Sequence, residues 1–533
     1  MAELLTVHES PAYRPVRLDS GRARVSNRWI WTLFALGLVH WLAFIFVVQP
    51  PSGRERDLIR LAAHPSQLLR KPQFSWEQGS LTGESWYIHM KQLSALQQGF
   101  RTRTLPYHVP KLLEYGAMVA PGMALPEAGR FFSMPDNWPV SPQIGLLSVL
   151  SLEDFVLFNW LALYIIGFYG CVLIARRYHL GWQAFTFLVV LFNLNGLITS
   201  NMATRMSEIS GYFFIPYLIL AVLEAGESDP RDWRAQWRVG LAMGIMLALI
   251  WWQGSAHPFI EWSTFLLFWS VVHWRRWRVP VVAWTVAFSM CAVRLLPAAV
   301  TWGAAKRYHL SNPGVFGFWA FDDYINGLAV AHSVIPNQDW TLYDYYVSIF
   351  GLAALAYLAL WAPWKGASWR RFRGWPGLWV ATGLTALCSF RRLKDLFVPP
   401  WVPLFNAEAW TSRYMLIPFT LLIVIAAINA QGAVERHWAS AKMRWLMLGG
   451  MAVTTVSLLN HSRLWRIWVV AAQDWGWKYP ERHTIAQVVN NPADTLYILS
   501  VHVGIAISIV ATIAAVWAWW RASARTSSTE TLS

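Results

Sequence analysis

The sequence predicts an all-α polytopic membrane protein with about twelve transmembrane helices. Of its 533 residues, 56% are hydrophobic and only 14% are charged, whereas soluble domains carry about 25% charged residues. The chain also contains 36 tryptophans, and tryptophan is enriched where helices meet the membrane–water interface. Finally, apolar stretches that approach the roughly 20 residues of a bilayer-spanning helix recur along the chain.

We count twelve such apolar segments, although several are short or interrupted by glycine, so the total could differ by one or two. Their positions are 29–48, 155–175, 182–199, 207–224, 237–252, 257–274, 279–297, 345–363, 375–390, 412–430, 444–460 and 498–520. The first segment is too long for the apolar core of a signal peptide, and no small-residue cleavage site follows it. We expect it to remain as an uncleaved anchor.

Basic residues mark every second connection between these segments. Short cytoplasmic connections retain Lys and Arg, so the alternation predicts an even number of helices with both termini in the cytoplasm. The net charge of +15 is then a consequence of topology, and no nucleic-acid partner is expected. The basic clusters lie at 14–28, 176–177, 231–238, 275–278, 365–373, 436–444 and 521–525.

The same topology divides the chain into unequal parts. Loops as long as those on the outer side are usually functional or independently folded, so we expect the functional site on the outer face. The parts are a cytoplasmic segment 1–28, the first helix 29–48, a large outer loop 49–154, a helical core 155–520 with outer loops at about 298–344 and 391–411, and a disordered tail 521–533.

The stretch TGESWYIHMKQ (82–92) in the first outer loop contains a candidate catalytic acid. In a helix, Glu84, Tyr87 and Lys91 share one face. An acid near a cation is held ionised, which suits a general base. The alternative is that Thr82 caps this helix and Glu84 interacts with its dipole.

A second acid and further short helices are predicted in the same loop. Asp57, within RERDLIRL, is the alternative catalytic acid. Its arginine neighbours fit equally well a helix that lies against lipid headgroups. The stretch 142–150 is expected to form a short amphipathic helix along the interface.

Several cations lie on the outer side, against the topological bias. They are Lys306 and Arg307 beyond the seventh helix, and Arg391, Arg392 and Arg413 around the third outer loop. Guanidinium groups there suit a phosphate or pyrophosphate. The alternatives are that the first two extend along the interface and that local carboxylates neutralise the others.

Two further residues are candidates for a polar pocket. His257 lies in the outer turn WWQGSAHPFIEW, where a structural role beside proline is the alternative. Asp322 has a second aspartate next to it and a histidine nearby. Adjacent carboxylates point in different directions, so this pair is weak as a dyad or metal site.

Common cofactor and metal signatures are absent from the sequence. It has no GxSxG, P-loop, HExxH or GxGxxG motif. Cys171, Cys291 and Cys388 lie in apolar segments and are expected to be small core residues. We therefore expect no cofactor and assign no metal ligand, with a divalent metal left open.

The order of features resembles the C-type (GT-C) membrane glycosyltransferases, and most of all the bacterial YfhO-like integral membrane family. The resemblance spans roughly 84 to 430, and each motif alone is degenerate. The leading acid of such families is usually Asp, where this chain has Glu84. The motifs are the acid followed by Gln92, then LPYHVPKLLEYG, FNLNGLITS, QGSAHP, RLLPAAVTWGAAKR and SRYMLIPFTLLIVIAA.

The resemblance implies a GT-C-like fold and transfer of a sugar, with inversion, from a polyprenyl-phosphate donor to a lipid or glycan acceptor on the outer face. Such a reaction would belong to cell-envelope glycan or glycoconjugate synthesis, and the resemblance implies a bacterial inner (cytoplasmic) membrane. Glu84 would be the general base. The donor phosphate would be bound by Arg413, Arg391, Arg392, Lys306 and Arg307, and the sugar and acceptor pocket would contain Tyr87, Lys91, His257 and Asp322.

Two other functions remain open at this point. A transporter or flippase for a lipid-linked glycan would use the same outer cations but would not need a catalytic base. A non-catalytic membrane scaffold is the third possibility. The long first outer loop favours the enzyme, because transport sites are expected near the bilayer midplane on broken helices. Membrane lipids are partners in every case, whereas the donor sugar, the acceptor and the oligomeric state are not predicted.

Overall fold

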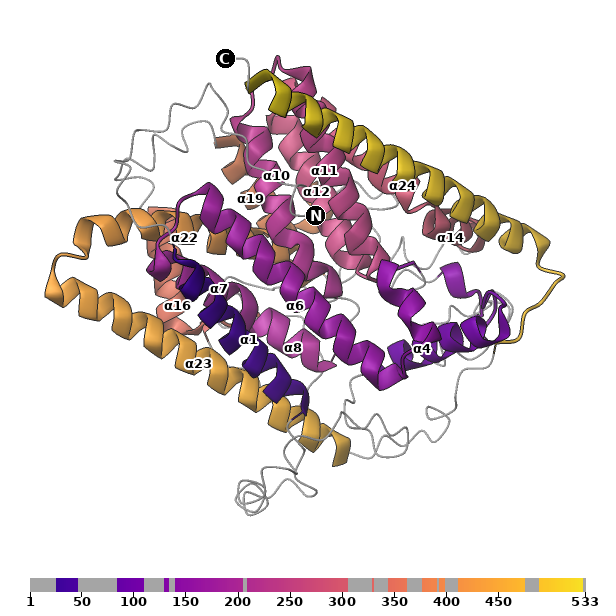
Figure 1. The fold of residues 1–533 in the computed structure, drawn as a ribbon, viewed down its shortest axis with the longest axis horizontal. Coiled ribbons are helices and arrows are strands. Elements are labelled where there is room, and N and C mark those ends of the chain that lie inside the picture. The colour runs from indigo at the N-terminus through magenta and orange to yellow at the C-terminus, as the bar shows by residue number, and fades with distance from the viewer. Residues whose placement is uncertain are drawn as a thin grey trace.

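The computed structural model describes residues 25–46, 84–109, 129–133, 140–204, 209–304, 328–329, 344–361, 376–390, 393–397, 411–474 and 488–530. Within these ranges every regular element is helical, apart from an isolated bridge between His108 and Arg130. The all-α fold class is therefore confirmed for the part of the chain described (Figure 1).

Most of the α-helices follow the apolar segments of the sequence, and the exceptions are those at 84–102 and 394–397. In the first half of the chain they are α1 (Asn27–Phe46), α4 (Glu84–Thr102), α6 (Leu152–Arg177), α7 (Trp182–Leu194), α8 (Gly196–Thr204), α10 (Ile215–Glu227), α11 (Trp233–Trp252) and α12 (Ala256–Val272). In the second half they are α13 (Arg278–Met290), α14 (Ala292–Ala304), α16 (Ser348–Leu355), α19 (Pro376–Cys388), α20 (Lys394–Phe397), α22 (Leu416–His437), α23 (Ala441–Asp474) and α24 (Thr495–Glu530). The 3₁₀ helices are η2 (Phe131–Ser133), η3 (Pro142–Ser148), η4 (Ser210–Phe214), η5 (Trp274–Arg276) and η9 (Thr411–Met415), and η8 (Ala356–Trp361) is a short π-helix.

Five helices within the described ranges are long and apolar enough to cross a membrane, or six if the bent pair α13–α14 is one span. Several helices of this length and composition support a membrane protein. Each of the twelve apolar segments coincides with one or more helices, but the count of twelve spans stays a prediction. The five are Asp154–Arg177, Trp182–Met202, Trp233–Trp252, Thr411–His437 and Thr495–Ser523.

Two apolar segments are broken rather than continuous. The axes of α13 and α14 differ by 74° across Cys291. Between α7 and α8 the break falls at Asn195, whose side-chain amide donates to the Leu191 carbonyl (2.7 Å) while its Oδ1 accepts from the Ile198 N–H (3.1 Å). This carboxamide satisfies backbone groups on both sides of the break, as a capping side chain does.

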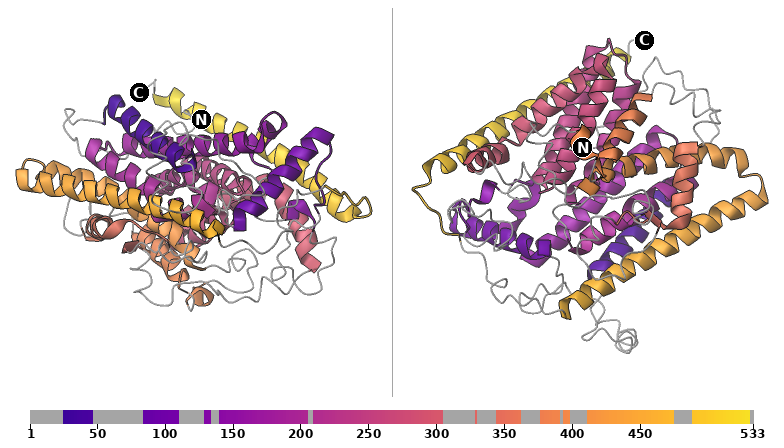
Figure 2. Two further views of the ribbon diagram at one scale, coloured as in Figure 1. Left: turned by 90° about the horizontal axis from the view of Figure 1, so that it is seen from below. Right: turned by 180° about the vertical axis from the view of Figure 1, so that it is seen from behind.

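The helices form a bundle with α23 and α24 on opposite sides (Figures 1 and 2). α23 packs against α1, α7, α8 and α16, whereas α24 packs against α11, α13 and α14. The interior holds large side chains such as Trp262, Trp269 and Trp465, each at most 1% exposed. The three cysteines are also buried, as expected. Helix α4 lies beyond one end of α6, across the bundle axis (Figure 1).

At one end of the bundle, the connections predicted to be cytoplasmic contact one another; we call it the basic end. Arg177 pairs with Glu227, and Arg238 pairs with Glu224. Arg276 donates to the carbonyl of Ser228 (2.7 Å). The ring of Trp182 packs edge to face against two others, with its centroid 5.6 Å from that of Trp29 and 5.7 Å from that of Trp438.

The opposite end, which we call the loop end, gathers the connections predicted to be outer. It brings residues 97–109, 129–133 and 140–150 against the start of α24 and the end of α14. The connections predicted to be cytoplasmic therefore lie at one end of the bundle and those predicted to be outer lie at the other, as the alternation of charge requires. Which end faces the cytoplasm stays a prediction from that charge.

Candidate functional site

Helix α4 places the candidate acid at the loop end. The expected helix at 84–92 is confirmed, and it extends to Thr102 with Glu84 as its first residue. Its second half is fastened to the bundle, since Leu93 is fully buried and Gln97 donates to the Leu150 carbonyl (3.0 Å). The Oε1 of Gln98 accepts from the Val488 N–H (3.2 Å). The side chains of Glu84, Tyr87 and Lys91 lie outside what the structure describes.

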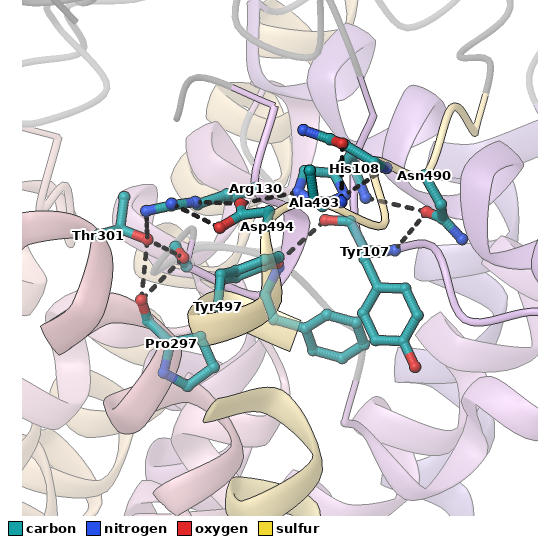
Figure 3. Close-up of polar contacts among 12 residues, drawn as sticks. Tyr107, His108, Arg130, Pro297, Thr301, Asn490, Ala493, Asp494 and Tyr497 are labelled. Atoms are coloured by element: carbon teal, nitrogen blue, oxygen red, sulfur yellow. Dashed lines mark hydrogen bonds and ion pairs between the residues drawn. The ribbon is translucent and has the colours of Figure 1, made fainter. Parts of the chain in front are cut away.

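Several polar side chains at the loop end contact Asp494, which lies immediately before α24 (Figure 3). Arg130 donates two hydrogen bonds to this carboxylate, from Nε to Oδ2 (2.7 Å) and from Nη2 to Oδ1 (2.8 Å). The Nε2 of His108 lies 2.9 Å from Oδ2. Side-chain exposure is 10% for Asp494 and 13% for Arg130. We call Arg130, His108, Asp494 and Asn490 the loop junction.

Hydrogen bonds from the backbone fix how His108 is held. The Asn491 N–H donates to its Nδ1 (3.2 Å), so Nδ1 is an acceptor and Nε2 carries the proton directed at Asp494. The Oδ1 of Asn490 accepts from the N–H groups of Tyr107 (3.0 Å) and His108 (3.2 Å). The first outer loop is thereby attached to the chain segment that leads into α24.

A second layer of contacts supports the guanidinium of Arg130 (Figure 3). It lies over the ring of Tyr497, 5.2 Å from the centroid, within the range of a cation–π contact. Its Nη1 is 3.4 Å from the Oγ1 of Thr301, which itself donates to the Pro297 carbonyl (2.9 Å). Ser133 contacts Thr301 at 2.6 Å. With His108, which contacts the same carboxylate, four separate stretches of chain meet at the loop junction.

Both oxygens of Asp494 are occupied by donors, so the loop junction is suited to holding chain segments together rather than to proton abstraction. Burial raises the pKa of Asp494, but the bonds from Arg130 and His108 outweigh that effect and hold the pKa below its ordinary value. The charged carboxylate is therefore the form that the fold stabilises.

This pKa shift predicts a specific dependence of stability on pH. A depressed carboxylate pKa contributes stability that is complete above about pH 5 and is lost as the pH falls below about 4, through the folded-state pKa. Unfolding of the detergent-solubilised protein, followed from about pH 7 to pH 3, should show this loss. Asp494→Asn should be less stable at neutral pH and should lack this part of the acid dependence. An identical acid-induced loss in both proteins would contradict the assignment.

Three carboxamides form another buried cluster at the loop end. The Nε2 of Gln143, on η3, donates to the Oδ1 of Asn159 on α6 (2.5 Å) and to the Oε1 of Gln253 (2.6 Å). Gln253 directly follows the last residue of α11. The next residue, Gly254, has φ 85°, a left-handed conformation that favours glycine. The motif QGSAHP is thus a tight turn, and it places the half-buried His257 in the first turn of α12.

Arg413, the cation given the leading role in phosphate binding, lies in η9 immediately before α22. It is half-buried. The hydroxyl of Tyr345 donates to the Ser412 carbonyl beside it (3.0 Å). η9 packs against α12 and α19, so Arg413 and His257 lie on neighbouring elements.

The remaining predicted site residues fall outside the described ranges. They are Asp57, Lys306, Arg307, Asp322, Arg391 and Arg392. Their roles, and the meeting of Glu84 with a phosphate-binding cation, stay predictions. No group of three or more His, Cys, Asp or Glu side chains with the geometry of a metal site occurs in the ranges described.

Sequence reasoning did not select the residues of the loop junction. His108 lies in the quoted motif LPYHVP but was given no role, and Arg130 carries no local signal. Asp494 belongs to the connection between the last two apolar segments, which was not counted among the long outer loops. An aspartate directly before an apolar helix is a capping signal, and it could have drawn attention to NNPADT.

Comparison of the chain with models of known protein families, with curated proteins and with solved structures finds no significant match.

Proposed function

We propose that the protein is a membrane glycosyltransferase of GT-C type. It transfers a sugar from a polyprenyl-phosphate-linked donor to a lipid or glycan acceptor at the loop end of the bundle. The reaction takes place on the outer face of the membrane, in the synthesis of a cell-envelope glycan or glycoconjugate.

The observation that carries this proposal is the gathering of long polar connections at one end of an apolar helical bundle. The loop junction ties Tyr107, His108 and Arg130 to the chain segment at the start of α24, and α4 is attached beside it. A lipid-linked donor has its phosphate at the membrane surface and its chain among the helices, so such an end is where donor and acceptor would meet.

In this mechanism Glu84 takes the proton of the acceptor hydroxyl as its oxygen attacks the anomeric carbon. The bond from that carbon to the donor phosphate breaks, and configuration inverts. Arg413, together with cations of the neighbouring loops, binds the polyprenyl phosphate that leaves and offsets its charge. The position of Glu84 at the first turn of α4 favours its ionised form through the helix dipole.

The test is a transfer assay in membranes with labelled polyprenyl-phosphate sugars. Wild type should transfer label to an acceptor, Glu84→Gln should lose transfer while still binding donor, and Arg413→Ala should bind donor more weakly. Glu435→Gln, an exposed carboxylate at the basic end, is the control and should retain transfer. Undiminished transfer by Glu84→Gln would remove that residue from the mechanism.

A flippase for a lipid-linked glycan is the second candidate, because one observation favours it. Asp344 and His461 form an ionisable pair that is at most 1% exposed in the helical body. Ionisable groups buried among transmembrane helices often mark transport pathways. Movement of a labelled lipid-linked glycan across vesicles that contain the purified protein, without any transferase activity, would decide for this candidate.

A further inference from the structure

Among the residues that the structure describes, Asp344 and His461 form the most deeply buried ion pair. The Nε2 of His461, on α23, lies 2.8 Å from the Oδ2 of Asp344, four residues before α16. The indole N–H of Trp465, one turn further along α23, donates to the same oxygen at 2.5 Å and lies 3.1 Å from the Nε2 of His461. The Oδ1 of Asp344 accepts from the Tyr346 N–H (3.2 Å). The carboxylate is thus surrounded by donors.

Within the described part of the chain, the other ring nitrogen of His461, Nδ1, lacks the hydrogen bonds that the Asp344 carboxylate receives. The side chain has 0% exposure, and its Nδ1 has no hydrogen-bond partner among the described residues. A buried polar atom without a partner costs about 1–3 kcal/mol. The ring is nevertheless firmly placed, since Tyr346 stacks on it with the ring centroids 4.4 Å apart. The cost is therefore not relieved by rotating the ring towards another donor or acceptor.

We propose that Asp344 and His461 form a proton-binding dyad, in which the Nδ1 of His461 takes up the proton. The indole N–H of Trp465 is closer to Asp344 than to Nε2, so Nε2, which faces the same carboxylate, is assigned the hydrogen and Nδ1 is left with a lone pair. Uptake forms one N–H bond at Nδ1 and converts the imidazole to imidazolium. The Asp344 carboxylate balances the new positive charge, and no other group has to change its protonation.

The surroundings offer no competing charge among the residues that the structure describes. α7 and α8, which pack against α23, contain no titratable side chain in their described parts. On α23 itself, Arg463 is exposed and bonded to Asn460. α1 contributes His40, whose Nε2 lies 3.4 Å from the hydroxyl of Ser462. Asp344 is therefore the counter-charge for His461, with Tyr346 and His40 as the nearest titratable neighbours.

The position of His461 along α23 places the dyad near the loop end of the bundle. His461 follows the start of α23 by 20 residues, which is about 30 Å along a helix and comparable to the hydrocarbon thickness of a bilayer. A proton bound there is close to the surface where the long connections meet. This inference is independent of the proposed function, because proton binding is measured directly.

The test is solid-state NMR of the full-length protein in lipid bilayers, with ¹⁵N-labelled histidine. As the pH is lowered from about 9 to about 4.5, one ring should change from the singly to the doubly protonated nitrogen pattern, and its signals should be missing in His461→Gln. His437→Gln, at an exposed position, is the matched control and should leave those signals in place. A His461 ring that stays singly protonated throughout would overturn the proposal.

Two variants test the counter-charge in opposite directions. Asp344→Asn keeps an acceptor for Nε2 but removes the negative charge, so the doubly protonated form should require a pH lower by at least about one unit. Trp465→Phe removes a donor that competes for the carboxylate, so the same form should appear at higher pH. Unchanged transitions in both variants would show that Asp344 does not govern the proton. The wild-type titration remains decisive if either variant fails to fold.

Discussion

Arg130→Met is expected to lower the free energy of unfolding by about 3–5 kcal/mol, because it leaves the buried carboxylate of Asp494 without its bidentate partner. Two bonds of 2.7 and 2.8 Å are lost together. The contact of the guanidinium with the Tyr497 ring is lost as well. Unfolding of the purified protein in detergent, by heat or by denaturant, measures the change.

The matched control is Arg101→Met, an exposed arginine in the last turn of α4. It should change stability by less than about 0.5 kcal/mol. The double variant Arg130→Met/Asp494→Asn should be less destabilised than the sum of its two single variants, since it leaves no unpaired charge. Strict additivity would mean that the two side chains do not act as a pair.

Gly196→Ala is expected to destabilise the protein by about 1–3 kcal/mol, the usual cost of overpacking. A Cβ at this position would overlap the Oδ1 of Asp344 and come within 2.7 Å of the Cβ of Tyr346. The Gly196 N–H also donates to the Tyr346 carbonyl (2.8 Å), which holds the two backbones close. The same unfolding assay measures the effect.

Gly383→Ala provides a control of opposite sign. It lies within α19, and a Cβ there would meet nothing within 4 Å. Alanine is the better helix former by roughly 0.5–1 kcal/mol, so this variant should be neutral or slightly more stable. Equal destabilisation by both substitutions would show that the contact between Gly196 and Asp344 is not the cause.

Hydrophobic patterning and charge predicted much of the fold. The apolar segments became helices because lipid leaves backbone groups no alternative partners, and basic residues separated the connections into two sets that meet at opposite ends. Local signals did not predict the 74° bend at Cys291. No Pro or Gly stands within five residues of Cys291, so the usual local marker of a sharp bend is missing at that position.

The candidate site was less predictable for a physical reason. The stretch at Glu84 was recognised because helical spacing and capping are local properties. Arg130 and Asp494 are 364 residues apart, so no window of sequence shows that they will meet. The motif FNLNG contains two residues with structural roles. Asn195 satisfies backbone groups at a helix break, and Gly196 packs closely against Asp344, which lies 148 residues further along the chain.

The span between the two halves of the loop junction also affects how the protein is made. At translation rates of about 5–20 residues per second, the 364 residues from Arg130 to Asp494 take roughly 20 to 70 s to synthesise. Throughout that interval the nascent chain carries an Arg130 whose partner does not yet exist. Chains that stall or end before α24 would keep this charge exposed, which would give membrane quality control a means to distinguish them from finished protein.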